Sequence, residues 1–258
     1  MGLNIITCIK SVINQAVEGK YIRAVENSSL NPFDIPAIQM ALSLKEKHGG
    51  SVTILTMGPE SAKYAIYDAM SMGADRGILL CDKTMAGSDT FVTSMILGTA
   101  ITKINNYDLV LFGTRTLDSD TGHVGPQTAQ MLSLPFLTNI LSLSKNDSDY
   151  NAKRKADGYI EKYELKGPAA FTISPDSFDS VMTTLYEIEN TFENKNIEVW
   201  DNSSLSLSDS LTGVNASPTK IIALNRVKKE KSCKFLEGSH EKMAETLVDK
   251  LTDQGFIG

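Results

Sequence analysis

The sequence predicts an α/β protein with a doubly wound, mainly parallel sheet, helices on both faces, an antiparallel extension and a C-terminal wrapping arm. In the first half of the chain, short apolar runs alternate with segments of helical period. Most of these runs are continuous, which is typical of strands buried on both faces. After Pro135 strand-like runs are joined by polar turns instead of helices, and after Ser174 the chain becomes irregular.

The elements of the first half follow in order as pairs of one strand and one helix. The expected strands are continuous runs of Ile, Val, Leu and Phe, and the expected helices each carry one apolar side. Right-handed crossovers between such strands give a sheet that is covered on both faces. The strands are expected at residues 3–9, 51–57, 76–81 and 108–112, and the helices at 31–49, 60–73, 88–104 and 128–134.

The second half is expected to extend the sheet and then leave it. Strand-like runs at 140–143, 159–165 and 169–174 predict a local antiparallel extension. A last helical pattern covers 241–255. Residues 175–258 lack the periodicity of an independent core, so we expect an α/β domain over 1–174 and a partner-docking segment with a C-terminal arm over 175–258. An arm packed on its own domain is the alternative.

Composition excludes several classes of partner. The 258 residues carry a formal net charge of −6, whereas nucleic acid and anionic membranes both attract a basic face. No apolar run approaches the roughly 20 residues that span a bilayer. The cysteines Cys8, Cys81 and Cys233 have no metal-binding or disulfide spacing, which favours a reducing compartment. We therefore expect a cytoplasmic protein that binds neither nucleic acid nor membrane.

The most informative stretch is GTRTLDSDTGHVGPQTAQMLSLP, residues 113–135, which runs from a predicted strand into a predicted helix. Its acids and hydroxyls can cap a helix, while Gly122 and Gly125 let the backbone approach a ligand closely. Free amides at such a helix start favour a phosphate, and ligands of doubly wound sheets bind beyond the carboxyl ends of the strands. An ordinary capped connection is the alternative. No catalytic triad, metal cluster or acid/base pair has suitable spacing, so we expect no catalytic residue and interpret Asp118 and Asp120 as caps.

The motifs of this sequence, taken together, resemble those of a known protein family. The sequence is similar, over nearly its whole length, to the small (beta) subunit of electron transfer flavoproteins. A generic nucleotide-binding stress-type α/β protein would share the fold class but would not explain the C-terminal motif or the long tail. The motifs that carry the resemblance are CIK at 8–10, NPFDIPAIQMALSLKEKHGG at 31–50, MGPESAKYAIYDAMSMGADRGILL at 57–80, SDTFVTS at 88–94, LDSDTGHVGPQTAQMLSLP at 117–135 and GVNASPTKI at 213–221.

The resemblance implies a heterodimer with an alpha subunit that carries a redox-active FAD. In the ordinary branch of the family the beta subunit holds structural AMP, and in the electron-bifurcating branch it holds a second FAD that accepts a hydride from NADH. The 1–174 domain would then be the nucleotide-binding domain. The cofactor-binding residues implied are Cys8, Asn31, Pro32, Phe33, Asp34, Met57, Asp89, Thr90, Thr93, Arg115, Asp118, Ser119, Asp120, Thr121, Gly122, His123, Val124, Gly125, Pro126, Gln127, Thr128 and Ala129. By default, however, Cys8 and Met57 are core residues, and Asn31 with Asp34 is a helix cap.

The loop sequence DSDTGHVGPQ favours FAD, because it is close to the DGDTxQVGPQ of bifurcating members. The hydroxyls and amides at 88–94 suit a ligand with a pyrophosphate, and Arg115 can place a positive charge near a reduced, anionic flavin. His123 at a helix start is expected to be neutral and hydrogen-bonded. AMP remains the alternative, because Ser119 replaces the family's glycine, His123 replaces its glutamine, and SVINQ at 11–15 replaces Val-Pro-Asp-Thr.

The resemblance also implies partners. Besides the alpha subunit, we expect a flavin-dependent dehydrogenase of the acyl-CoA or lactate type, and ferredoxin as a low-potential acceptor. The family's partner-docking loop is basic, whereas residues 175–200 here are acidic and apolar, with Phe178, Met182, Leu185 and Tyr186 as an expected anchor patch. Aromatic side chains of the tail should be buried against other chains; these are Phe178, Tyr186, Phe192, Trp200, Phe235 and Phe256.

Overall fold

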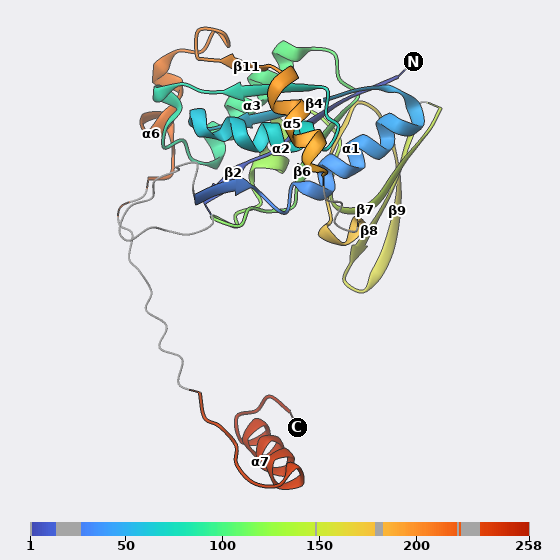
Figure 1. Ribbon diagram of the computed structural model, residues 1–258, viewed down its shortest axis with the longest axis vertical. Coiled ribbons are helices and arrows are strands. Elements are labelled where there is room, and N and C mark those ends of the chain that lie inside the picture. The colour runs from blue at the N-terminus through green and yellow to red at the C-terminus, as the bar shows by residue number, and fades with distance from the viewer. Residues whose placement is uncertain are drawn as a thin grey trace. The chain divides into compact units, whose positions relative to one another are not determined.

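A nine-stranded sheet forms the centre of the fold (Figure 1). Its strand order is β11-β5-β4-β1-β6-β10-β7-β8-β9. In this computed structural model, which describes residues 2–13, 27–147, 149–178, 183–220, 222 and 233–257, all neighbours from β11 to β7 are parallel. The strands β7, β8 and β9 pair antiparallel. The strands of this sheet are β1 (Leu3–Cys8), β4 (Gly50–Met57), β5 (Arg76–Leu80), β6 (Leu109–Gly113), β7 (Phe136–Asn146), β8 (Asp149–Ala156), β9 (Tyr159–Lys166), β10 (Ala169–Ile173) and β11 (Ile197–Trp200).

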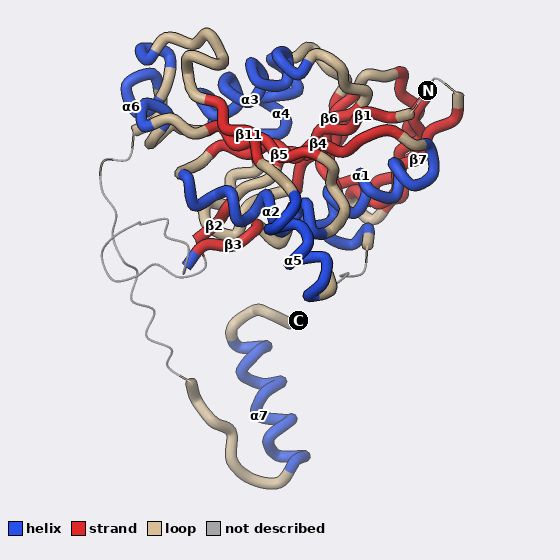
Figure 2. Tube along the Cα trace, turned by 45° about the horizontal axis from the view of Figure 1, so that its top comes forward, coloured by secondary structure: helices blue, strands red, loops and turns tan. Residues whose placement is uncertain are grey.

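Helices cover both faces of the parallel part (Figure 2). The helices α1 and α2 pack on one face, with α5 beside α2, and α3 and α4 pack on the other. A small antiparallel pair, β2 (Ser11–Ile13) and β3 (Ser28–Leu30), lies outside the main sheet. The helices are α1 (Ile35–His48), α2 (Lys63–Ser71), α3 (Thr90–Ile104), α4 (Val124–Met131), α5 (Leu185–Asn194), the four-residue α6 (Gly213–Ala216) and α7 (His240–Asp253), with short 3-10 turns at Glu60–Ala62, Lys83–Met85, Pro175–Ser177 and Asp209–Leu211.

The buried strands explain why the sheet is covered twice. Ile5 and Ile6 are adjacent in β1 and both are fully buried, but Ile5 belongs to the apolar cluster under α1 and α2, and Ile6 to the cluster under α3 and α4. A strand that buries both faces needs a continuous apolar run, as the sequence predicts. The doubly wound α/β class is therefore confirmed.

The extension differs from the prediction in one respect. Residues 169–174 were expected to be antiparallel, but β10 lies between β6 and β7 and is parallel to both. Its five residues are all buried, which is the signature of a central parallel strand. The strand β8 has no counterpart among the predicted strands, because its sequence DYNAKRKA is polar and lies in an open hairpin. The edge strand β11 is only four residues long and also escapes prediction.

The helix boundaries differ from the predictions by a few residues. The helix expected from residue 31 begins at Ile35, because residues 32–34 form a turn before it. The helix expected from residue 128 begins earlier, at Val124, and ends at Met131.

Three of the expected tail anchors pack partly on the chain itself, and their burial against other chains stays a prediction. Phe178 packs against the apolar cluster under α1 and α2, and Trp200 against the cluster under α3 and α4. Phe192 stacks on Tyr67 with a centroid distance of 4.4 Å. Leu185 and the remaining aromatic anchors are exposed, and Met182 lies outside the described residues.

The chain divides into two compact units, residues 1–220 and 221–258. The first unit contains the sheet, including β11. The second contains α7, which is capped by Ser239 and has no buried residue. None of the described helices is long and apolar enough to cross a membrane. The functional division at 174/175 concerns partner docking and stays a prediction.

Candidate nucleotide-binding site

The predicted loop leaves the carboxyl edge of the sheet between two central strands. Cys8, at the end of β1, pairs with Phe112, next to the end of β6. The loop of residues 114–123 follows, and α4 begins at Val124. This is the edge where doubly wound sheets bind their ligands.

Asn31 connects the turn before α1 to this loop. Its side-chain amide donates to the Asp34 carboxylate and to the Arg115 carbonyl, both at 2.9 Å. Its side-chain oxygen accepts from the Leu117 amide at 3.2 Å. Asn31 is fully buried. It therefore cross-links two segments 84 residues apart, and neither it nor Asp34 caps the helix through its side chain.

Asp34 is the buried carboxyl group of the site. Its carboxylate accepts from the Lys10 backbone amide at 2.7 Å. An added Cβ on Gly113 would lie only 2.2 Å from Asp34 Oδ1, so the end of β6 approaches the carboxylate as closely as glycine allows. Burial raises the pKa of Asp34 to about 7, although hydrogen bonds from Lys10, Asn31 and Gly113 act in the opposite direction.

Lys10 holds the middle of the loop, and it is absent from the predicted site residues. Its ammonium group donates to Asp118 Oδ1 at 2.6 Å and to Ser119 Oγ at 3.2 Å. The Asp118 side chain is 2% exposed. Asp118 is thus an ion-pair partner here. The only sequence signal for Lys10 was its place in the CIK motif at the end of the first strand.

The outer part of the loop is open to solvent. Arg115 lies over the Phe33 ring, with 4.5 Å between the guanidinium carbon and the ring centroid, and 3.7 Å from the Asp120 carboxylate. Asp120 and Gly122 have positive φ, of 52° and 64°. These left-handed residues turn the chain back toward α4.

The N-terminal ends of α3 and α4 lie side by side. Ser94 Oγ is hydrogen-bonded to the Val124 carbonyl at 3.3 Å and to Gln127 Oε1 at 3.1 Å. Asp89 caps α3 by accepting from the Val92 amide. His123 precedes α4 but makes no capping hydrogen bond with its side chain. The N-terminal parts of the two helices are therefore joined beside the loop that precedes α4, and helix starts of this kind favour phosphates.

Cys8 and Met57 stand at the ends of β1 and β4. Cys8 is 5% exposed, and burial, helped by the negative charge of Asp34, raises the pKa of its thiol. The thiol is therefore protonated at neutral pH. Met57 packs partly buried against the same apolar cluster.

The structure separates the predicted binding residues by exposure. Some can meet a ligand with their side chains, while the buried ones support the loop from below. The exposed residues are Pro32, Arg115, Ser119, Asp120, Thr121 and His123; the half-buried ones are Phe33, Met57, Asp89, Thr90, Thr93, Asp118, Gly122, Val124, Pro126 and Gln127; the buried ones are Cys8, Asn31, Asp34, Gly125, Thr128 and Ala129. Contact of each with a nucleotide stays a prediction.

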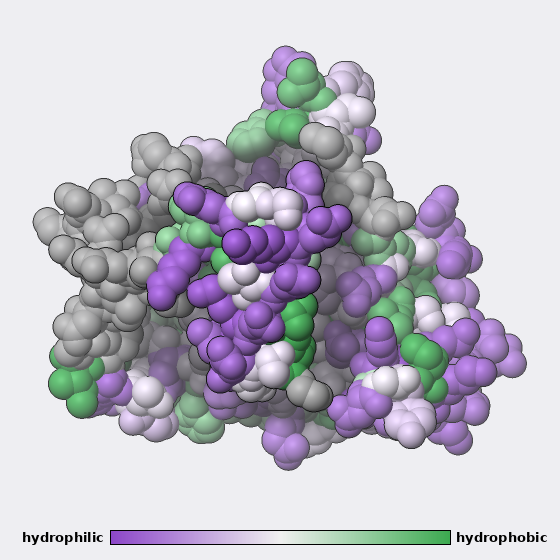
Figure 3. Space-filling model, turned by 90° about the horizontal axis from the view of Figure 1, so that it is seen from below, coloured by the Kyte–Doolittle hydropathy of each residue, from purple (hydrophilic) through white to green (hydrophobic). Residues whose placement is uncertain are grey.

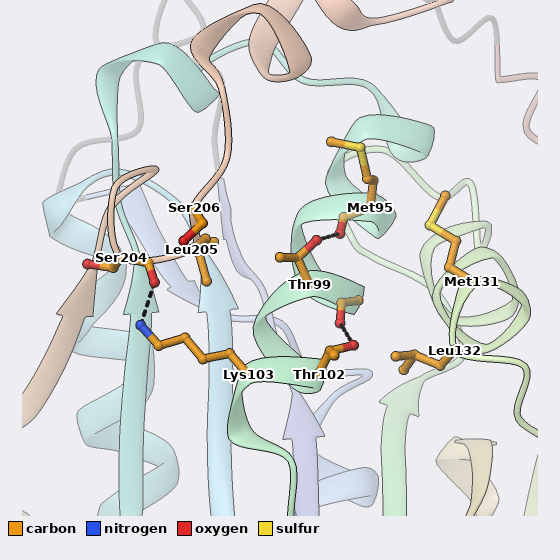
Figure 4. Close-up of a pocket in the computed structure, with 10 residues that line it drawn as sticks. Met95, Thr99, Thr102, Lys103, Met131, Leu132, Ser204, Leu205 and Ser206 are labelled. Atoms are coloured by element: carbon orange, nitrogen blue, oxygen red, sulfur yellow. Dashed lines mark hydrogen bonds between the residues drawn. The ribbon is translucent and has the colours of Figure 1, made fainter.

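A groove of about 660 Å³ lies elsewhere, between α3, α4 and residues 204–206 (Figure 4). Met95, Met131 and Leu205 line it, and Lys103 reaches across to the Ser204 carbonyl. None of the predicted binding residues lines this groove. Among the residues that the structure describes, no cluster of three or more His, Cys, Asp or Glu side chains suits a metal ion.

The fold is that of a doubly wound α/β protein in which a glycine-containing loop follows a central strand at the carboxyl edge of the sheet. Residues 19–205 match the family model described as Electron transfer flavoprotein domain. The chain belongs to the electron transfer flavoprotein family, among its beta subunits.

Individual relatives match over nearly the full length. The chain is 30% identical to the electron transfer flavoprotein subunit beta of Thermoanaerobacterium thermosaccharolyticum, with 99% of this chain and 100% of the relative covered. It is 33% identical to the same subunit of Clostridium acetobutylicum, with the same coverage. It is also 32% identical to the caffeyl-CoA reductase-Etf complex subunit CarD of Acetobacterium woodii, with 93% and 92% covered.

The raised pKa of Asp34 predicts a specific pH dependence of stability. Between about pH 4 and pH 7 the folded chain keeps a proton that the unfolded chain, with its ordinary value of 3.8, has lost. The stabilisation is complete below the unfolded value and is lost as the pH rises through 7. The variant Asp34→Asn cannot titrate. The free energy of unfolding of the wild type should therefore fall relative to this variant by up to about 4 kcal/mol from pH 4 to pH 8. Urea unfolding at several pH values measures this difference in the free energy of unfolding. If the wild type and Asp34→Asn gave parallel curves of unfolding free energy against pH, the pKa of Asp34 would not be raised.

Proposed function

We propose that this chain binds FAD at the carboxyl edge of β1 and β6, and that with its alpha subunit it passes electrons from NADH by flavin-based bifurcation. The observation that supports this is the DSDTGHVGPQ loop, pinned by Lys10 and Asn31 beside the paired starts of α3 and α4. FAD held there would supply hydride acceptance from NADH and one-electron transfer to a low-potential acceptor such as ferredoxin and to the alpha-subunit FAD.

The residues present fit a dinucleotide. The start of α4 has no side-chain cap, so its amides suit a phosphate. Gly122 just before it has a φ of 64°, a conformation that favours glycine. The hydroxyls of Ser119 and Thr121 and the positive charge of Arg115 lie on the exposed side of the loop. The protein's part in this proposal is to bind, to orient and to place positive charge near the ligand.

The alternative is that the same site holds structural AMP and that the chain transfers no electrons itself. An anaerobic titration of the purified heterodimer with NADH separates the two. Under our proposal, NADH reduces the flavin in the absence of any dehydrogenase. Flavin absorbance that is unchanged by excess NADH would support the AMP alternative.

We further propose that the heterodimer works in the cytoplasm with a flavin-dependent dehydrogenase of the acyl-CoA or lactate type. The relative CarD is named as part of a caffeyl-CoA reductase complex, which supports the acyl-CoA type. The exposed end of α5 is the proposed docking patch, because Leu185 is 85% and Tyr186 is 74% exposed. Phe178 is left out of that patch because it is partly buried against the apolar cluster under α1 and α2.

Removal of one loop hydroxyl tests the site directly. Thr121→Val leaves ligand oxygens or amides unpaired, at a cost of about 1–3 kcal/mol. The affinity for the bound nucleotide should fall about ten- to a hundredfold. The matched control is Thr102→Val on α3, whose hydroxyl bonds only its own helix at the Gly98 carbonyl. Equal dissociation constants for wild type and Thr121→Val, measured by calorimetry, would remove Thr121 from the site.

A further inference from the structure

Asp89 is hydrogen-bonded to residues 217–219, which lead into the C-terminal arm (here residues 221–258), and it stands at the start of α3. Its backbone amide donates to Ser217 Oγ at 2.9 Å, and its carboxylate Oδ2 accepts from the Thr219 amide at 2.8 Å. The other carboxylate oxygen accepts from the Val92 amide at 3.0 Å and caps α3. Both oxygens therefore have partners within the chain. One side chain serves the helix and the arm together.

The segment around Ser217 fits tightly against the loop before α3. The Gly213 amide donates to Ser88 Oγ at 3.1 Å, and an added Cβ on Gly213 would lie 2.2 Å from the Thr84 carbonyl oxygen. Ser217 is buried and also donates to the Gly213 carbonyl at 2.8 Å. A displacement of this segment would therefore disturb the loop that leads into α3.

The start of α3 is in turn joined to the nucleotide loop. Ser94, in the second turn of α3, is hydrogen-bonded to Val124 and Gln127 of α4. The anchored residue Thr219 stands next to Lys220, where the first compact unit ends. Beyond it the arm carries α7, whose apolar residues Leu247 and Val248 are about half exposed and which buries none of its own residues. An amphipathic helix of this kind needs a partner surface.

We infer that Asp89 is a positioning residue: with Ser217 and Thr219 it forms a latch that couples binding of the alpha subunit by the arm to nucleotide affinity at the starts of α3 and α4. This inference rests on the proposed nucleotide site. A partner that immobilises the arm favours the latched state, in which the helix starts are correctly placed for the ligand. Because coupling is reciprocal, the nucleotide must strengthen binding of the alpha subunit by the same factor.

Two variants break the latch while leaving the loop residues unchanged. Asp89→Ser keeps a hydroxyl that can cap α3 at Val92 but is too short to serve Thr219 as well. Ser217→Ala removes the hydroxyl oxygen that accepts the hydrogen bond from the Asp89 backbone amide. The matched control is Ser208→Ala, on the same segment, whose hydroxyl pairs with Ser210 and not with α3.

The experiment measures the dissociation constants of FAD and of AMP for the full-length chain alone and in complex with its alpha subunit. For wild type and Ser208→Ala we expect the alpha subunit to tighten nucleotide binding about tenfold. For both latch variants this ratio should fall to about twofold or less. For Ser217→Ala, which changes no predicted nucleotide-binding residue, the affinity of the free chain should change little. Circular dichroism and thermal unfolding confirm that each variant is folded.

The possible outcomes are distinct. A wild-type ratio of one, or unchanged ratios in both latch variants, would overturn the inference. So would an equal loss of affinity with and without the alpha subunit, because Asp89 would then act as a ligand contact or a plain structural residue. If the wild-type complex binds neither FAD nor AMP, the proposed function itself fails.

Discussion

The variant Gly113→Ala is expected to lose the bound nucleotide and to be strongly destabilised. The added Cβ would lie 2.2 Å from Asp34 Oδ1 and 2.4 Å from the Phe33 carbonyl oxygen. Overpacking of a tight site costs about 1–3 kcal/mol, and here one of the two clashing atoms belongs to the backbone. The Asp34 carboxylate accepts hydrogen bonds from Lys10 and Asn31, the two residues that hold the loop. Its displacement would therefore disturb both of them.

Gly98→Ala is the matched control for this substitution. Gly98 lies in the middle of α3, and a Cβ there would meet only Met131 Cβ at an ordinary 3.7 Å. Because Ala favours helix by about 1 kcal/mol over Gly, this variant should be as stable as the wild type or more stable, with full nucleotide content. Thermal unfolding and ligand content of the purified complexes provide the comparison. A Gly113→Ala protein that retains its nucleotide would show that the contact between β6 and Asp34 does not shape the site.

Truncation after Lys220 is expected to leave a folded, nucleotide-binding unit that no longer co-purifies with the alpha subunit. Residues 1–220 form a compact unit of their own. The arm beyond exposes Phe235 and Phe256, which are 88% and 72% accessible in this chain. Burial of such side chains against a partner contributes about 1.5–3 kcal/mol each, so the arm can supply much of the binding energy. Co-expression with the alpha subunit and size-exclusion chromatography measure the outcome.

A cut after Ser174, which the sequence favoured as the boundary, is a poor test of the same idea. It would remove β11, which pairs with β5 along the edge of the sheet. It would also remove Asn202, which is buried and donates to Thr84 and Thr212. A 1–174 chain is therefore expected to aggregate. If the 1–220 chain still bound the alpha subunit at full yield, the arm would not be the interface.

The sequence was sufficient to predict those parts of the fold in which one local signal dominates. The strands β1, β4, β5 and β6 are buried on both faces, so their apolar runs are continuous and easily recognised. The strand β11 is short and partly exposed, and its position depends on pairing with β5, more than a hundred residues away in the chain. The chain order of β10 gave no hint that it inserts between β6 and β7. Pairings of this kind are set by tertiary contacts that no local pattern records.

In the candidate site, too, contacts between residues far apart in the sequence could not be predicted. Its loop could be located from the glycines and acids after a buried strand, but its supports could not. The Lys10–Asp118 ion pair joins residues 108 apart, and the Asn31–Arg115 hydrogen bond joins residues 84 apart. Trp200, expected at a partner surface, instead lies under Lys103, 4.4 Å from the ammonium group to the ring centroid. An aromatic residue in a polar segment does not reveal whether it packs on its own domain or on another chain.

Hydrophilic residues cover most of the described part of the face in Figure 3, and hydrophobic residues appear there in separate groups. The exposed apolar residues that we connect with partners belong to α5 and to the arm.

The most direct test of the central claim, that this chain holds its own FAD, is a count of the ligands in the purified heterodimer. Acid denaturation releases every non-covalently bound nucleotide, and chromatography against standards identifies and quantifies FAD and AMP per heterodimer. If this chain holds its own FAD, the heterodimer releases two FAD, one from each subunit, and no AMP. One FAD and one AMP per heterodimer would contradict it and would assign this chain to the branch of the family that holds AMP.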